Sequence, residues 1–328
     1  MTPPVVEPAG RPEESGPGGL VGVPDPGSST VRLRLGVAYD GSEFCGWARQ
    51  PGLRSVQGEL ESALRLVLRI DPAVPVRVAA AGRTDAGVHA VGQVCHCDIP
   101  TGSWEAAVGA RARALPRPTS ERADAAGAAA GGVLRRRLNG LLPADLRVRA
   151  VGVAPLGFDA RWSALWRSYS YLVADDAAGQ DPRTRGHVLW HSRQLDDEAM
   201  NAAAAPFVGE HDFAAYCRAR AGSSSVRTIH GLGWRRVGRS AGAASPLEFS
   251  VRADAFCHSM VRALVGAFIA VGDGRWPPGR PADLLAAARR VPAIVTAPAH
   301  PLTLVEVGYP LDIALAAQAE GARRWRGR

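Results

Sequence analysis

Asp85 is the residue of this sequence best placed to do chemistry. It lies between two glycines in a short segment, with Arg83, Thr84 and His89 close to it along the chain. A carboxylate can act as a nucleophile without a metal or a redox cofactor. An aspartate in a glycine-rich loop is usually a turn residue, but a turn has no need of an arginine, a threonine and a histidine around it. We therefore interpret Asp85 as the candidate nucleophile.

The triplet Cys95-His96-Cys97 offers a different chemistry, because cysteine and histidine are the usual zinc ligands. Strand alternation would place Cys95 and Cys97 on one face and His96 on the other. No second cysteine pair completes a tetrahedral ligand set. We expect these cysteines to be structural, and we predict no metal site.

The basic residues of the chain are all arginines. Lysine and arginine together number 39 against 31 acids, and the absence of lysine excludes Schiff-base and P-loop lysine chemistry. Guanidinium groups bind phosphate bidentately and stack on bases, which favours a nucleic-acid partner. A coding bias toward arginine would give the same composition. The run Arg135–Arg137 is equally open to two interpretations, a solvated helix face or an RNA contact.

The elements around Asp85 follow from hydrophobic periodicity. Apolar residues alternate over residues 31–37, which predicts a half-buried strand. Ser55 precedes apolar residues at three- and four-residue spacing over 56–68, which predicts a capped amphipathic helix. Residues 76–81 and 93–99 are predicted to be strands on either side of the loop that carries the aspartate.

The rest of the chain repeats this mixture of strands and helices. Helices are predicted over residues 133–142, from 195 onward and over 256–271. Strands are predicted over 146–153, 158–164, 166–173, 187–191, 228–234, 247–253 and 302–309. Each half then has about four strands and two helices, which predicts an α+β fold of two related domains, with mixed or antiparallel sheets, helices on one side and a cleft between the domains.

Domain boundaries are predicted from changes in composition. Residues 1–30 are rich in proline, glycine and acids, which is typical of a disordered tail. The N-terminal domain should span 31–150, with a low-complexity insertion at 101–132, partly helical near 104–115. The C-terminal domain should span 151–311, followed by a tail at 312–328.

The five cysteines are odd in number and scattered, which favours reduced thiols over a disulfide framework. No apolar run has membrane-spanning length, and no signal peptide is recognisable. We therefore expect a soluble cytoplasmic protein.

Many segments of the chain resemble the tRNA pseudouridine synthase A family, from about residue 31 to 310. The most specific is Gly82–Ala90, which is similar to the family signature. Further similarity lies in 39–42, 46–47, 56–60, 138–139, 142–145, 158–163, 167–171, 211–213, 227–229, 260–262 and 265–266. The chain departs from the family pattern at Phe256–Ser259, at Ala263 and at Pro301, and these departures leave Asp85, Tyr169 and Arg262 in place.

The resemblance implies roles for four residues. Asp85 would be the nucleophile, ionised beside its ion-pair partner Arg262. Tyr169 would pack on the target base. The alternative is that it is an ordinary core residue, because half-buried strands often carry tyrosines. Arg83 would either occupy the space of the flipped base or bind phosphate. Asp85 could attack C1′ of the ribose or add to C6 of the uracil, and the sequence leaves both routes open.

The resemblance also implies the substrate and the assembly. The chain would isomerise uridine to pseudouridine in the anticodon arm of tRNA, at tRNA positions 38 to 40, as a homodimer and without a metal or organic cofactor. Two other hypotheses are a non-catalytic RNA-binding or chaperone-like protein on the same fold and a Cys/His metal hydrolase. The set Asp85, Tyr169 and Arg262 argues against the first, and the missing ligand spacing argues against the second.

Overall fold

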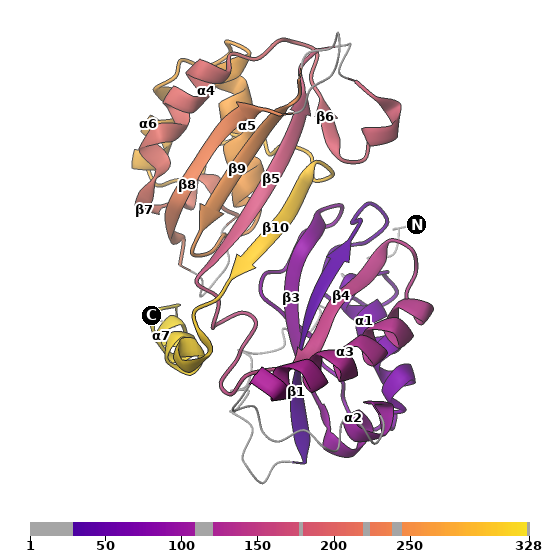
Figure 1. Cartoon of the computed structure of the whole chain (residues 1–328). Helices are drawn as coiled ribbons and strands as arrows, with labels where there is room; N and C mark the ends of the chain where they lie inside the picture. The colour runs from indigo at the N-terminus through magenta and orange to yellow at the C-terminus, as the bar shows by residue number, and fades with distance from the viewer. Residues whose placement is uncertain (1–28, 109–120, 177–179, 219–223, 238–244, 327–328) are drawn as a thin grey trace, which may run out of the picture.

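The computed structural model describes residues 29–108, 121–176, 180–218, 224–237 and 245–326 of the chain. One mostly antiparallel ten-stranded sheet runs through it, in the order β4-β1-β3-β10-β5-β9-β8-β7, with β2 beside β3 and β6 beside β5 (Figure 1). The predicted mixed α+β class is confirmed. The expected tail at 1–30 lies almost entirely outside the described residues.

The N-terminal part of the sheet is formed by β1 (Thr30–Tyr39), β3 (His89–Pro100) and β4 (Leu146–Val153), with the short β2 (Ala79–Ala80). Helices α1 (Val56–Leu68), α2 (Thr101–Val108) and α3 (Glu121–Leu141) pack against it (Figure 1). The Ser55 hydroxyl accepts a hydrogen bond from the amide of Gly58 and caps α1 as predicted. The apolar faces of β1 and α1 then meet in the core.

The C-terminal part is formed by β5 (Trp166–Ala174), β6 (Val188–Trp190), β7 (Gly209–Asp212), β8 (Val226–Arg236) and β9 (Leu247–Ala253). Helices α4 (Asp197–Ala204), α5 (Met260–Gly272) and α6 (Arg280–Ala286) accompany these strands. Figure 1 shows this second group of helices well separated from α1–α3.

Strand β10 (Leu302–Gly308) joins the two parts, and it is the last strand in the chain. It pairs antiparallel with β5 and parallel with β3, where Thr303 lies opposite His89. The sheet is therefore continuous between the two parts. The proposed domain division at about residue 150 stays a prediction.

Several segments differ from the sequence-based expectation, and the strand expected at 76–81 is reduced to Ala79–Ala80. Residues 158–164 form turns rather than a strand, because the Asp159 carboxylate accepts the amides of Arg161 and Trp162 and bends the chain. Helix α3 begins at Glu121, well before the expected residue 133. Much of the expected tail at 312–328 is helix α7 (Leu315–Arg326), whose Leu315 is buried.

Part of the expected insertion at 101–132 is helical, because its residues belong to α2 and to the start of α3. The helical start expected near 104 is confirmed as far as Val108, and 109–115 lies outside the described residues. Gly131 of α3 packs directly on β4, since a β-carbon there would lie 1.8 Å from the Val151 carbonyl oxygen.

The sequence led us to expect that all five cysteines are reduced thiols, and this expectation is wrong for two of them. Cys217 and Cys257 form a disulfide with their Cα atoms 5.7 Å apart, whereas Cys45, Cys95 and Cys97 are free. The two partners are 40 residues apart in sequence, so only the folded chain brings them together. Within the described residues, none of the helices is both long and apolar enough to cross a membrane.

Candidate active site

The loop that carries Asp85 is fixed by hydrogen bonds at several points. It connects β2 to β3, and its Thr84 hydroxyl is 2.8 Å from the Tyr39 hydroxyl. The amide of Trp47 donates to the Thr84 carbonyl at 3.0 Å. The side-chain amide of Gln93 donates to the Gly82 carbonyl at 2.7 Å. These bonds hold the backbone just before Asp85, and after it the amide of Gly87 donates to the carbonyl of Phe44 at 3.3 Å, so the loop is fixed as a reacting carboxylate requires.

Two glycines allow the loop to take this path. Gly87 has φ +77°, in the left-handed region that glycine adopts without steric cost. Gly46, with φ +95°, lies so close that a β-carbon on it would be 2.9 Å from the Thr84 carbonyl oxygen. The Gly46-Trp47 pair is therefore part of the support of the Asp85 loop.

Arg262 lies beside Asp85, as the family resemblance implied. Its Nη1 is 3.3 Å from Oδ2 of Asp85, and its Nε donates to the carbonyl of Ala297 at 2.7 Å. The guanidinium is thus held between a backbone carbonyl and the carboxylate. Arg262 lies in the first turn of α5, so the orientation of this helix sets the direction from which the positive charge approaches.

Two further residues near the carboxylate were not predicted. His258 Nε2 lies 3.5 Å from Oδ1 of Asp85, and the Ser259 hydroxyl donates to Oδ2 at 3.4 Å. Both belong to the segment where the sequence departs from the family pattern. The sequence feature that could have indicated these two residues is their position, one helical turn before Arg262. Ser259 has φ +60°, which is uncommon for a residue other than glycine, and this turn brings both side chains toward Asp85.

Tyr169 lies on β5 next to the same segment, and the residue is 8% exposed. Its ring centroid is 5.1 Å from that of Phe256, edge to face. A β-carbon on Gly82 would lie 3.8 Å from the Tyr169 hydroxyl. Burial, and to a lesser degree the charge of Asp85, raises the pKa of Tyr169 well above its usual range, so the phenol is neutral at physiological pH.

Arg83 does not join this group. Its side chain is exposed, and it makes no hydrogen bond or ion pair with any residue in the described ranges. The structure therefore brings together Asp85, Arg262 and the neighbourhood of Tyr169, while Arg83 extends into solvent beside them.

The Cys95-His96-Cys97 triplet is arranged as strand alternation predicts. Cys95 and Cys97 are buried in the core, and His96 points elsewhere, where its Nδ1 accepts the amide of Ala160 at 3.0 Å. Burial raises the pKa of the Cys97 thiol to about 12. A buried thiol with a raised pKa is a poor nucleophile at neutral pH.

The site can present one partly exposed carboxylate to a substrate. The Asp85 side chain is 30% exposed, Arg262 and Ser259 donate to its Oδ2, and Nε2 of His258 lies 3.5 Å from its Oδ1. An aromatic ring and an exposed arginine lie nearby. This combination suits nucleophilic attack on a planar, uncharged group with an adjacent phosphate.

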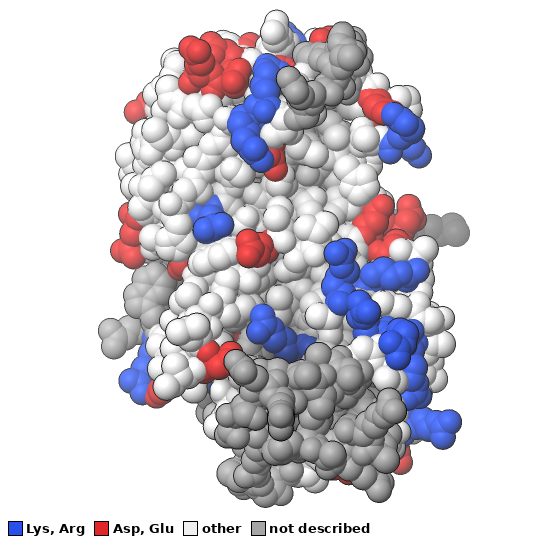
Figure 2. Space-filling model, in the orientation of Figure 1, with Lys and Arg blue, Asp and Glu red and all other residues white. Residues whose placement is uncertain are grey.

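Charge is distributed unevenly over the surface. Figure 2 shows arginine side chains gathered along one edge of the N-terminal part, in the region that α3 and β4 occupy in Figure 1. Arg135, Arg136 and Arg149 are exposed on these two elements. A stripe of guanidinium groups is the electrostatic feature expected of a surface that binds nucleic acid.

Known proteins resemble this chain over most of its length. The family described as tRNA pseudouridine synthase matches residues 36–130 and 203–310. A relative from Streptomyces griseus, named tRNA pseudouridine synthase A, is 50% identical over 296 residues, which cover 90% of this chain and 94% of the relative. A relative of the same name from Frankia casuarinae is also 50% identical, covering 90% and 96%. One from Mycobacterium leprae is 45% identical, covering 89% and 94%.

The match with the family includes the Asp85 loop and the Arg262 helix, the two segments that meet in the site. These similarities extend far beyond any single motif. The chain belongs to the tRNA pseudouridine synthase family.

Proposed function

We propose that this protein isomerises uridine to pseudouridine in tRNA, with Asp85 as the nucleophile. The observation that carries the proposal is the Asp85 carboxylate, held on a rigid loop 3.3 Å from Arg262 and open to solvent on one side. The names of the relatives support tRNA as the substrate.

The reaction needs one nucleophile and no net redox change. The bond between N1 of uracil and C1′ of ribose breaks, the base turns, and a bond forms between C5 and C1′. N1 gains a proton and C5 loses one, so atoms and electrons balance. Asp85 can take part by attacking C1′ or by adding to C6. In either route a carboxylate oxygen forms a bond that must later break, and the donors from Arg262 and Ser259 would stabilise the carboxylate as a leaving group.

The other candidate residues have roles in binding the base. An enzyme that acts on a base inside a helical stem must turn it out of the stack. Tyr169 offers an aromatic ring near Asp85 on which the turned base can pack. Arg83 is exposed at the mouth of the site, where it can fill the vacated space or bind a phosphate.

We further propose that the target lies in the anticodon arm, at tRNA positions 38 to 40, and that the protein acts in the cytoplasm as a homodimer. The target and the homodimer rest on the family resemblance, and the cytoplasmic location on the expectation drawn from the sequence. The exposed arginines of α3 and β4 support binding of an RNA backbone.

The test is tritium release from tRNA labelled at C5 of uridine. Wild-type protein should release tritium, and Asp85→Asn should not, because the amide is a poor nucleophile of nearly the same shape. Asp283→Asn, at an exposed aspartate of α6, is the matched control and should behave as wild type. tRNA binding by each protein should be measured in parallel.

Two results would contradict the proposal. Equal release by wild type and Asp85→Asn would exclude Asp85 as the nucleophile. Binding of tRNA without release by wild type would favour the non-catalytic RNA-binding alternative.

A further inference from the structure

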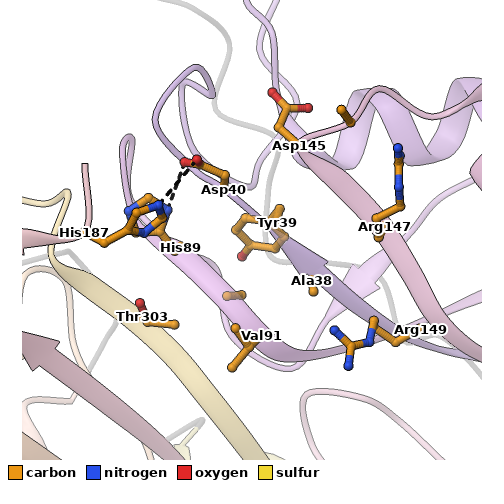
Figure 3. Close-up of a pocket in the computed structure, with 12 residues that line it drawn as sticks. Ala38, Tyr39, Asp40, His89, Val91, Asp145, Arg147, Arg149, His187 and Thr303 are labelled. Atoms are coloured by element: carbon orange, nitrogen blue, oxygen red, sulfur yellow. Dashed lines mark ion pairs between the residues drawn. The ribbon is translucent and has the colours of Figure 1, made fainter. Parts of the chain in front are cut away.

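A second group of ionisable residues lies outside the set around Asp85, at one rim of a pocket of about 300 Å³. Asp40, His89 and His187 converge there (Figure 3), with potential ligand atoms within 4.8 Å of one another. By residue type and distance the group could hold a metal ion. The hydrogen bonds of His89 argue for a different role.

Both ring nitrogens of His89 are already occupied. Nδ1 accepts the amide of Gly41 at 2.9 Å. Nε2 faces two carbonyl oxygens, of Gly186 at 2.9 Å and of His300 at 2.5 Å. A carbonyl oxygen can only accept, so Nε2 must carry the proton. His89 is 3% exposed, so its ring nitrogens are bonded to protein groups rather than to bulk water.

Asp40 does not change this assignment. Its Oδ1 lies 3.1 Å from Nδ1 of His89, but the same oxygen already accepts the amide and the hydroxyl of Ser42. The backbone amide of Gly41 cannot turn away, whereas the Asp40 side chain is partly exposed. A metal on Nδ1 would have to displace the Gly41 amide, and Asp40 and His187 alone are too few ligands for a stable site.

The partners of His89 come from three distant parts of the chain. Gly41 follows β1, Gly186 precedes β6, and His300 precedes β10, so the hydrogen bonds span 48, 97 and 211 residues of sequence. His187 lies over the ring, with centroids 4.2 Å apart. His89 therefore connects the N-terminal and C-terminal parts of the sheet at one point.

That point is the end of the Asp85 loop. His89 begins β3 directly after Val88, and the amide of Val88 donates to the carbonyl of Asp85 at 3.2 Å. Arg262, the charged partner of Asp85, belongs to the other part of the molecule. The distance between Asp85 and Arg262 thus depends on how the two parts are joined. The hydrogen bonds of His89 join them only one tight turn after Asp85 in the chain.

We propose that His89 is a positioning residue for Asp85: as a neutral ring protonated on Nε2, it fixes the end of the catalytic loop to the C-terminal part of the molecule. The proposal rests on the proposed function of Asp85. It assigns His89 no contact with the substrate and no metal.

Three variants test it. His89→Ala removes all three hydrogen bonds of the ring, to Gly41, Gly186 and His300. His89→Asn keeps an acceptor near the position of Nδ1, and His89→Gln keeps a donor near that of Nε2. His230→Ala, at an exposed histidine of β8, is the control. We expect His89→Ala to lower kcat for tritium release roughly 10- to 100-fold, the range that a misplaced reacting group costs, with KM for tRNA within about twofold. His89→Gln should restore more of kcat than His89→Asn.

Hydrogen exchange of the free protein provides a readout that does not depend on activity. Amides in 84–88 should exchange faster in His89→Ala than in wild type, while those in α6 should not change. If wild type releases no tritium, the proposed function fails, and the exchange result still decides whether His89 fixes the loop.

Other outcomes would overturn the proposal. They are unchanged kcat and unchanged exchange in His89→Ala, a rise in KM alone, or a loss of kcat that follows only the loss of folded protein. Stoichiometric binding of Zn²⁺ by wild type that His89→Ala abolishes would instead favour the metal site.

Discussion

The guanidinium of Arg262 lies 3.3 Å from the carboxylate of Asp85, although the two residues are 177 positions apart in the sequence. Asp85 lies on the loop between β2 and β3 and Arg262 in helix α5, and each is held by backbone hydrogen bonds of its own. Their proximity is thus a property of the whole fold, and it can be tested from several directions.

Replacing Arg262 should slow the chemical step more than it weakens substrate binding. Arg262→Gln keeps a donor but removes the charge next to Asp85, and a lost charge-assisted contact in a partly buried site costs about 3 kcal/mol, or roughly 100-fold in rate. Single-turnover tritium release measures this step. Arg183→Gln is the control, because Arg183 is exposed and pairs only with the nearby Asp181 within the described residues. An equal effect of both substitutions would argue against the ion pair.

The pH dependence of stability should report on His96. Burial, with a smaller contribution from Arg32, lowers the pKa of His96 from 6.5 to about 4. As the pH falls below 6.5, His96 of the unfolded chain takes up a proton, whereas His96 of the folded protein stays neutral until about pH 4. Stability from this group is complete above pH 6.5 and is lost as the pH falls toward 4, by about 3 kcal/mol in total.

Urea unfolding of wild type and His96→Asn at pH 7.5 and pH 5 tests this expectation. The asparagine can still accept the amide of Ala160 but does not titrate. Wild type should lose more stability than the variant between the two pH values. Parallel losses would show that other groups carry the pH dependence.

The Cys217–Cys257 disulfide should stabilise the fold measurably. It closes a loop of about 40 residues, and a cross-link of that span restricts the unfolded chain by about 4 kcal/mol. Reduction with a phosphine should lower the urea midpoint of wild type and leave that of Cys217→Ala/Cys257→Ala unchanged. An identical midpoint for oxidised and reduced wild type would contradict the contribution of this bond.

Thiol reactivity should separate the three free cysteines. Cys95 and Cys97 are buried and their pKa values are raised by that burial, whereas Cys45 is only half-buried. An aromatic disulfide reagent at pH 8 should therefore modify about one thiol per native chain, and three after unfolding without reductant. Rapid modification of Cys95 or Cys97 in the native protein would be inconsistent with their burial.

Binding of tRNA should weaken steeply with added salt, because phosphate contacts release counterions. Arg149 is exposed, and its guanidinium has no partner in the described part of the chain. If it contacts a phosphate, Arg149→Gln should reduce the slope of log K against log salt by about one. Arg183→Gln should leave the slope unchanged. Equal slopes for Arg149→Gln and wild type would remove β4 from the binding surface.

Local sequence predicted most of the elements but not the limits of β2, β3 or α3. The alternation over 31–37, the Ser55 cap and the apolar run of α5 each depend on neighbours a few residues away, so periodicity and capping predicted them. The turn at 158–164 escaped prediction, because the side chain of Asp159 overrides an apolar pattern there.

The tertiary structure alone decided what surrounds the catalytic loop. The family resemblance suggested Asp85 and Arg262 as partners. His258, Ser259 and the three bonds of His89 could not be found in this way. They depend on β10, the last strand of the chain, pairing between β3 and β5. Short-range patterns carry no information about such pairings, because strands of similar composition can be ordered in many ways and only the packing of the complete sheet selects one.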